Sequence, residues 1–168
     1  SAFGTSPERT TQLDVGLLHR SEGWNATVSA FAGRIDDYIL IQSGVARTNP
    51  MRTAIVARNV DATTRGLEAG LGYAFAPLWK ADATLAWVRG DNDTDGTPLA
   101  QQPPLEARLS VARDGPEWSL GALLRAVARQ DRVDPGKGNI AGQDIGPTAG
   151  FAIFSLNAAW RFSKAVTL

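Results

Sequence analysis

The sequence contains no cysteine and only one histidine and one methionine among its 168 residues. Without cysteine, the chain can form neither disulfides nor thiolate metal sites. Lys+Arg and Asp+Glu both total 17, so there is no basic surplus of the kind that binds nucleic acid. An apolar run of about 18 residues is also missing, so the sequence predicts no transmembrane helix. Soluble β-proteins and membrane barrels remain open.

Apolar and polar residues alternate with a period of two in most of the chain, which is typical of β-strands with unlike faces. From Trp79, for example, one face carries Trp79, Ala81, Ala83, Leu85 and Trp87. The same alternation starts again near Leu13, Trp24, Leu67, Leu105, Trp118 and Leu156. The pattern places the following residues on one apolar face, which we expect to contact lipid: Leu13, Leu71, Leu85, Leu109, Leu120 and Leu156.

The connections between these segments alternate in length. Short connections are expected at Ser21–Gly23, Ala76–Leu78, Asp114–Glu117 and Ser163–Lys164. Long connections, rich in Gly, Pro, Asn and Asp, are expected at Ser43–Arg58, Gly90–Pro104 and Gln130–Ala149. Short periplasmic turns and long extracellular loops are the plan of an outer-membrane barrel. The sequence therefore predicts an all-β fold, a segment of an antiparallel up-and-down transmembrane β-barrel.

Aromatic residues gather at the strand ends. Trp24, Trp79 and Trp118 follow short turns, whereas Tyr73, Phe75, Trp160 and Phe162 precede them, as in an aromatic girdle at one membrane interface. Tyr38, Trp87 and Phe151 are expected to form the opposite girdle. The alternative is a soluble antiparallel sandwich, which would place its tryptophans in mid-strand and more Val and Ile on its buried face.

Several segments resemble motifs of TonB-dependent receptors. The residues that carry the resemblance are Thr5–Thr10 with Gln12–Gly16 (an "L-x-P-E-x-[ST]" loop and strand), Asn59–Glu68 (an "N-x-x-x-A…G-x-E" strand), Trp79–Ala83 and Pro103–Leu109. Pro103–Leu109, Gly136–Asn139 and Gly146–Asn157 are similar to the branch of TonB-dependent copper receptors.

The resemblance implies a wall segment and extracellular loops of an active importer of copper, another metal or a metal chelate. It also implies outer-membrane lipid, a plug domain and the TonB energy-coupling complex as partners. Barrels of this family have about 22 strands, and roughly seven are expected here. We therefore expect residues 1–168 to be a partial barrel domain that lacks the plug and the closing strand. Made alone, it should self-associate through its edge strands.

No residue is predicted to be catalytic and no cofactor is implied. Glu68, Asp82 and Glu106 are expected to face the barrel lumen and to pair with Lys80, Arg108 or Arg125. The run Gly90–Gly96 resembles half of a calcium loop, but position 102 is Gln, so a solvated acidic turn is expected. His19 and Met51 are expected at opposite ends of the barrel, too far apart to share a metal ion.

The residues expected to contact a ligand are Arg47, Met51 and Arg52, in the first long loop. Two alternatives to an importer remain. A non-transport outer-membrane barrel or a soluble sandwich would act as an adhesin or binding module. An outer-membrane hydrolase would need a histidine near Ser or Asp at a suitable end of the barrel.

Overall fold

The computed structural model describes residues 4–46, 52–139, 142–163 and 166–167. Its strands are β1 (Arg9–Ser21), β2 (Trp24–Ala46), β3 (Thr53–Ala76), β4 (Trp79–Asn92), β5 (Thr97–Pro98), β6 (Glu106–Asp114), β7 (Trp118–Val127), β8 (Lys137–Gly138), β9 (Phe151–Ser163) and β10 (Val166–Thr167). They form one antiparallel sheet in the order β1-β2-β3-β4-β6-β7-β9-β10, with β5 on β4 and β8 on β2. The described residues contain no helix that is long and apolar enough to cross a membrane.

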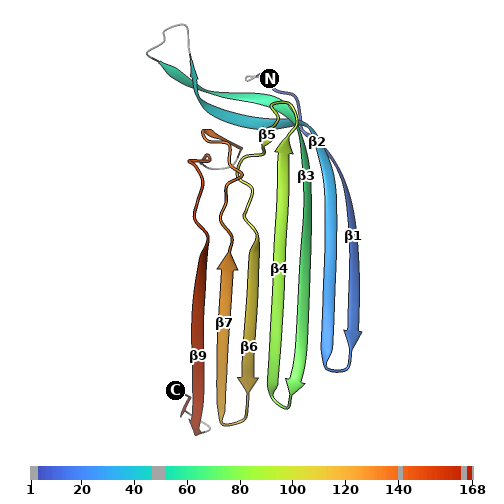
Figure 1. Cartoon of the computed structure of the whole chain (residues 1–168), viewed down its shortest axis with the longest axis vertical. Helices are drawn as coiled ribbons and strands as arrows, with labels where there is room; N and C mark the ends of the chain where they lie inside the picture. The colour runs from blue at the N-terminus through green and yellow to red at the C-terminus, as the bar shows by residue number, and fades with distance from the viewer. Residues whose placement is uncertain (1–3, 47–51, 140–141, 164–165, 168) are drawn as a thin grey trace.

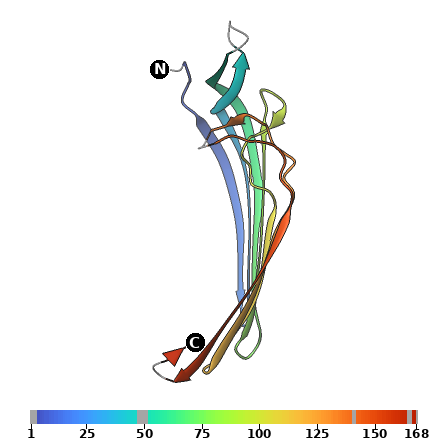
Figure 2. The same cartoon turned by 90° about the vertical axis from the view of Figure 1, so that its left-hand side faces the viewer.

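The sheet is a single curved layer (Figures 1 and 2). Its order is linear from β1 to β10, so the two ends do not pair and the sheet is open. The face with the predicted lipid-contacting leucines, here called the outer face, is solvent-exposed in the isolated chain. Leu13 is 68% exposed, Leu85 37% and Leu156 67%. In the described part of the chain, no second layer of strands covers these side chains, so the sandwich alternative is wrong.

Three of the predicted short connections, those after Ser21, Ala76 and Asp114, lie where the sequence predicts them, whereas the fourth, Ser163–Lys164, lies partly outside the described residues. β1 and β2 meet at Ser21 and Trp24, and β3 and β4 meet at Ala76 and Trp79. The registers place Trp24 beside Tyr73 and Trp118 beside Trp160. The aromatic residues therefore gather on one face at the short-turn end, which confirms the predicted girdle.

The first long connection is shorter than predicted. Instead of a loop over Ser43–Arg58, β2 continues to Ala46 and β3 begins at Thr53. The register of the β2–β3 pair shifts at Ile35–Tyr38 and again at Gln42–Val45, and Gly44 adopts the left-handed conformation with φ of 73°. Such bulges break the regular alternation, so the sequence pattern fades while the pairing continues. The hairpin turns across the long-loop end of the sheet (Figure 1).

The first of these bulges changes which way Tyr38 points. Ile35 pairs with Ala62 but Tyr38 pairs with Val60, so β2 has one residue more than β3 between these pairs. Asp37 absorbs the extra residue with φ of 59°, a conformation that Asp tolerates better than most residues. Beyond the bulge Tyr38 shares the inner face with Val60 instead of facing lipid.

The buried apolar residues of the described chain lie at the long-loop end. Five of them form one cluster, made of Tyr38, Leu40, Val60, Ala62 and Leu99, and Ala100 is also buried. The expectation that Tyr38 belongs to the second aromatic girdle is therefore wrong, because the bulge moves its side chain into this cluster. Trp87 stays on the outer face and is 39% exposed, as the girdle requires.

Phe151 is also on the inner face. It pairs with Val127, in the same row as Glu106 and Glu68, and the ring lies 5.6 Å from the Arg125 guanidinium. The prediction of a lipid-facing Phe151 is wrong because β9 opens with apolar residues on both faces, from Phe151 to Phe154, so alternation alone does not fix its phase.

Candidate functional site

Side chains from distant loops meet in a charged cluster centred on Asp95, at the long-loop end. Arg58 on β3 and Lys137 on β8 both bind the Asp95 carboxylate, the latter with its Nζ 3.3 Å from Oδ2. Asn92, which is 1% exposed, donates from Nδ2 to the same oxygen at 2.8 Å. The hydrogen bond from Arg58 keeps the pKa of Asp95 below its ordinary value, although partial burial opposes this.

Lys137 joins this cluster to a second carboxylate. Its Nζ lies 2.9 Å from Asp134 Oδ2, and Asp134 also accepts a hydrogen bond from Thr97 Oγ1 at 2.7 Å. Burial alone would lower the pKa of Lys137, but its bonds to Asp134 and Asp95 raise it above the ordinary value. The ammonium therefore stays charged and links β8 to the β4–β5 turn.

The loop 128–150 is further attached through its backbone. Lys137 and Gly138 form β8, which pairs with Ile41 and Gln42 of β2. The Asp144 carboxylate accepts hydrogen bonds from the backbone N–H groups of Asp134 and Gln101, at 2.9 and 3.2 Å. Strands β2 and β3, the connection between β4 and β6, and the loop 128–150 are thus joined into one platform, which was not apparent from the sequence.

The acidic run Gly90–Gly96 is not the solvated turn that we expected. Asp95 has a side chain only 22% exposed and is paired with two cations. Asp91 is bound by Arg89 and Arg132, and these contacts lower its pKa even though burial would raise it. These carboxylates hold loops together, and the described residues contain no group of His, Cys, Asp and Glu side chains suited to a metal ion.

The predicted ligand-contacting residues are not brought together in the described structure. Arg52 is exposed just before β3, whereas Arg47 and Met51 lie outside the described residues. Ala46 pairs with Thr53, so this connection is the tip of the β2–β3 hairpin. A role for Arg47, Met51 and Arg52 in ligand contact stays a prediction.

His19 does not approach the inner face. It pairs with Ala26, and its imidazole stacks on the Trp24 ring with centroids 4.3 Å apart. The ring therefore belongs to the aromatic girdle on the outer face. A histidine in this position is not available to a substrate inside the barrel.

The inner face carries an ion-pair cluster in mid-sheet. Glu106 Oε1 lies 2.6 Å from Arg108 Nε, and Glu106 Oε2 lies 2.6 Å from Arg125 Nη2. This confirms the predicted cross-strand pairing for Glu106. No ion pair involves Glu68 or Asp82 within the described residues, so the expectation fails for these two carboxylates there.

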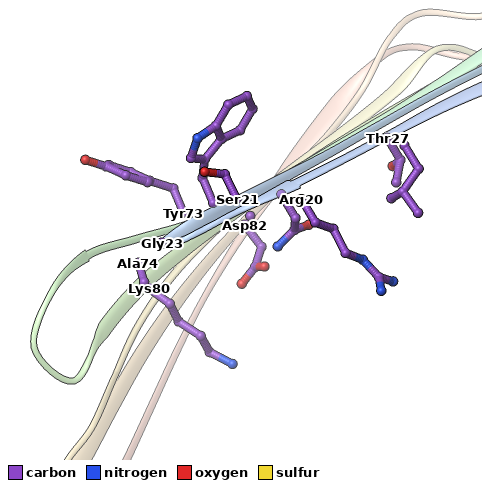
Figure 3. Close-up of a pocket in the computed structure, with 12 residues that line it drawn as sticks. Arg20, Ser21, Gly23, Thr27, Tyr73, Ala74, Lys80 and Asp82 are labelled. Carbon is purple, nitrogen blue, oxygen red and sulfur yellow. The ribbon is translucent and has the colours of Figure 1, made fainter.

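An open hollow of about 700 Å³ lies beside this cluster. Phe31, Glu68, Glu106, Arg125 and Phe151 line it, together with Ala86 and Val127. The two faces also differ at the short-turn end. Figure 3 shows the aromatic side chain of Tyr73 on one side of the sheet and the charged side chains of Arg20, Lys80 and Asp82 on the other. The inner face is polar with apolar patches, whereas the outer face is aromatic and aliphatic.

The model of the TonB dependent receptor-like β-barrel family matches residues 2–168. The chain therefore belongs to this family, whose members are outer-membrane transporters and receptors and not enzymes. The sheet is accordingly an antiparallel transmembrane barrel segment that remains unclosed in this chain. No curated protein matches the sequence.

Among solved structures, the copper transporter OprC is 41% identical with a TM-score of 0.85, over 95% of this chain and 24% of that chain. The FrpB iron transporter (F3-3 variant) from Neisseria meningitidis is 19% identical with a TM-score of 0.66, over 94% of this chain and 24% of that one. The siderophore receptor PirA from Acinetobacter baumannii is 16% identical with a TM-score of 0.69, over 95% and 26%. The chain thus spans about a quarter of the length of these structures.

Proposed function

We propose that this chain forms part of the wall and extracellular loops of an outer-membrane active transporter that imports copper. The observation that carries the proposal is the 41% identity to a copper transporter over 95% of the chain. The other similar structures, an iron transporter and a siderophore receptor, share less than 20% identity and support only the fold. Another metal or a metal chelate is the broader form of the same proposal.

In this proposal the long-loop end is extracellular and the short-turn end periplasmic. Residues 1–168 are one part of the barrel domain, and the plug domain, the closing strand and the contact with the TonB complex belong to other parts of the receptor. The Asp95–Lys137 platform holds the extracellular loops in place, and the inner face forms one side of the lumen. The segment supplies structure and contacts but no catalytic group.

Apart from Met51, which stays a predicted ligand contact, the copper ligands are proposed to lie elsewhere in the receptor. Copper prefers Cys, Met and His as ligands, and this chain offers only His19 and Met51. His19 is stacked on Trp24 at the outer face, which separates it from substrate in the lumen. The His19→Ala variant of the full-length receptor should therefore bind Cu²⁺ with unchanged affinity in calorimetry.

Uptake of radioactive copper by cells that produce the full-length receptor tests the proposal. We expect saturable uptake that stops when a proton uncoupler is added, because import through this family depends on TonB. A receptor that takes up a ferric siderophore but no copper would restrict the proposal to metal chelates. Energy-independent uptake, or none of either substrate, would overturn it.

A further inference from the structure

The turns that join β1 to β2 and β3 to β4 lie at the same end of the sheet (Figure 1) and share one backbone feature. Each leaves two residues between its paired strand ends, Glu22 and Gly23 in the first turn and Pro77 and Leu78 in the second. The second residue is left-handed in both turns, with φ of 82° at Gly23 and 70° at Leu78. Glycine adopts this conformation freely, whereas the Cβ of leucine crowds the backbone. Leu78 therefore holds a strained position that the other turn assigns to glycine.

The side chain that is kept at the cost of this strain is large, apolar and half-exposed. Leu78 is 50% exposed and Phe75 is 45% exposed. The rings of Tyr73, Phe75 and Trp79 form a series, with centroids 6.3 Å apart from Tyr73 to Phe75 and 6.1 Å apart from Phe75 to Trp79. The turn thus continues the apolar surface of the aromatic girdle to which Tyr73 belongs. Strained backbone conformations cluster at sites of function, which points to a role for this surface.

The β3–β4 turn also differs from its neighbours in charge. No residue from Tyr73 to Trp79 has a side chain that is charged at neutral pH. By contrast, Glu22 lies in the β1–β2 turn, and Asp114 and Glu117 flank the β6–β7 turn. Moving a charged group out of water is costly. The β3–β4 turn is therefore the one of these three whose side chains do not oppose transfer into an apolar medium.

The backbone of the turn is suited to the same transfer. Backbone N–H and C=O groups need hydrogen-bond partners when they leave water. Pro77 has no N–H group, and the Leu78 carbonyl accepts a hydrogen bond from the Asp114 N–H at 2.9 Å. Before the turn, the Ala74 N–H donates to the Gly23 carbonyl at 2.7 Å. These features lower the free energy needed to remove the turn from water.

The distance of the turn from the girdle agrees with a position at the bilayer interface. Tyr73 pairs with Trp24 in the girdle, and β3 ends three residues later at Ala76. Three residues span about 10 Å along a strand, which is about 7–8 Å in depth at a tilt of about 40°. The interfacial region of each leaflet is about 5–8 Å thick. The turn therefore reaches about as far as the lipid headgroups do.

We propose that the β3–β4 turn is embedded in the periplasmic leaflet of the outer membrane, where Leu78 anchors it among phospholipids. Contact of the Leu78 side chain with lipid removes apolar surface from water and so offsets the strain of its backbone conformation. Anchored in this way, the turn fixes the depth of β3 and β4 in the membrane. The inference rests on the proposed outer-membrane placement and not on the transported substrate.

The test places the photoreactive residue benzoylphenylalanine at position 78 of the full-length receptor in cells and identifies the cross-linked molecules by mass spectrometry. Leu124, in an apolar row of the outer face, is the lipid-facing reference. Glu117 is the matched control, because it directly precedes Trp118 as Leu78 directly precedes Trp79. We expect phospholipid adducts at position 78 in a yield at least fivefold that at position 117.

The possible adducts separate the anchor from the membrane placement. Lipid adducts at position 124 without any at position 78 would overturn the anchor alone, whereas their absence from both would overturn the outer-membrane placement as well. Equal yields at positions 78 and 117 would show that any turn at this end reaches lipid, and would overturn a special role for Leu78. A protein adduct in place of lipid at position 78 would overturn the lipid assignment.

The substitution Leu78→Gly tests the balance between strain and lipid contact. It relieves the left-handed strain but removes the side chain, and urea titration of the full-length receptor in phosphatidylcholine vesicles measures the result. We expect the folding equilibrium constant to fall at least threefold. Leu78→Asn, which tolerates the left-handed conformation but is polar, should lower it as well. An equilibrium constant that rises in Leu78→Gly would show that strain outweighs any lipid contact and would overturn the proposal.

Discussion

Leu123 and Leu124 are neighbours on β7 that differ in the face they present. Leu124 lies in an apolar row of the outer face, between Leu109 on β6 and Phe154 on β9. Leu123 lies on the inner face between Ser110 and Ser155. Their exposed fractions are similar, 41% and 38%. Replacing each by Arg therefore tests the direction of the side chain rather than its burial.

The expected cost follows from the position of these residues in the membrane. They are midway between Trp118 of the girdle and Ala128, whose N–H donates to Leu105 near the other end of the band. An Arg facing lipid near the midplane costs about 2–4 kcal/mol, whereas an Arg facing the lumen avoids the hydrocarbon. We expect Leu124→Arg to cost about 3 kcal/mol and Leu123→Arg less than about 1 kcal/mol. A difference of about 2 kcal/mol is about 30-fold in the folding equilibrium.

Urea titration of the full-length receptor in phospholipid vesicles, followed by tryptophan fluorescence, measures both variants. Leu123→Ala and Leu124→Ala report how much of each effect is lost packing. Gly121, also on the inner face, is a poorer control because a Cβ there would collide with the Asn157 side chain. Equal costs for Leu123→Arg and Leu124→Arg, or a larger cost for Leu123→Arg, would refute the assignment of the two faces.

Three further predictions concern the loops, Tyr38 and the isolated chain. Asp95→Asn removes the carboxylate that binds Arg58 and Lys137. The rate of amide hydrogen exchange in residues 134–144 should therefore rise about tenfold, which corresponds to a loss of about 1.4 kcal/mol in the free energy of local opening. The control Asp131→Asn, which removes an exposed partner of nearby Arg129, should change the exchange rate little. Because the pKa of Asp95 is lowered from 3.8, its contribution is complete above that value and should be lost only as pH falls through the lower folded-state pKa; loss already at neutral pH would contradict this. Burial, and then the charge of Glu8, raises the pKa of Tyr38 to about 12, so its contribution to stability is complete below pH 10 and is lost as pH rises through the folded-state pKa; the 295 nm absorbance that Tyr38→Phe removes should titrate near pH 12, and titration near 10 would show that Tyr38 is not buried. The isolated chain has unpaired strand edges and an exposed apolar face, so light scattering without detergent should show association; a clean monomer would contradict it.

The membrane-spanning part of the fold could be predicted from the sequence because lipid imposes one strict rule on it. Every second residue of a membrane-spanning strand faces hydrocarbon. The alternation of apolar and polar residues around Leu85 and Leu120 therefore predicts that both side chains point to lipid. The girdle around Trp24 and Trp160 follows from the same strands and their short turns. Family motifs added the identity of the barrel, which alternation alone does not provide.

Above the apolar band the same reasoning loses its basis. Tyr38 is displaced by a single extra residue at Asp37, and no local pattern marks that insertion. The contact of Lys137 with Asp95 joins residues that are 42 positions apart, and neither residue has a neighbour that specifies its partner. The carboxylates of the Asp-rich run Gly90–Gly96 look solvated in the sequence, because the cations that bind them come from other segments of the chain. Which loop residues can pair depends on where the strands position the loops in space. Predicting these pairs therefore requires the register of the strands.

The position of the bulge at Asp37 explains why the side chains that follow it on β2 must change faces. Below it, the outer face of β2 meets lipid and its apolar residues point outward. Above it, the protein leaves the membrane, and apolar residues must point inward to be buried. One inserted residue reverses the phase and moves Tyr38 and Leu40 into the buried cluster. The structure holds the insertion from two sides: Asn59 Nδ2 on β3 donates to the Asp37 carbonyl at 2.5 Å, and Glu8 Oε1, just before β1, accepts from the Ile39 N–H at 2.5 Å.

Deleting Asp37 should therefore uncouple the loops from the barrel. Without the extra residue Tyr38 and Leu40 return to the outer side, and the loss of their burial costs about 1.5–3 kcal/mol each. Asp37→Gly is the matched control, since glycine adopts φ near 59° without strain and keeps the insertion. In full-length receptor embedded in membranes, protease should cut the extracellular loops of the deletion variant rapidly, while the heat-resistant migration of the barrel in gels is retained in both variants. Loops that stay protected after the deletion would show that the bulge does not determine their packing. Loss of the barrel itself would show that the packing of the loops and the folding of the barrel are not separable.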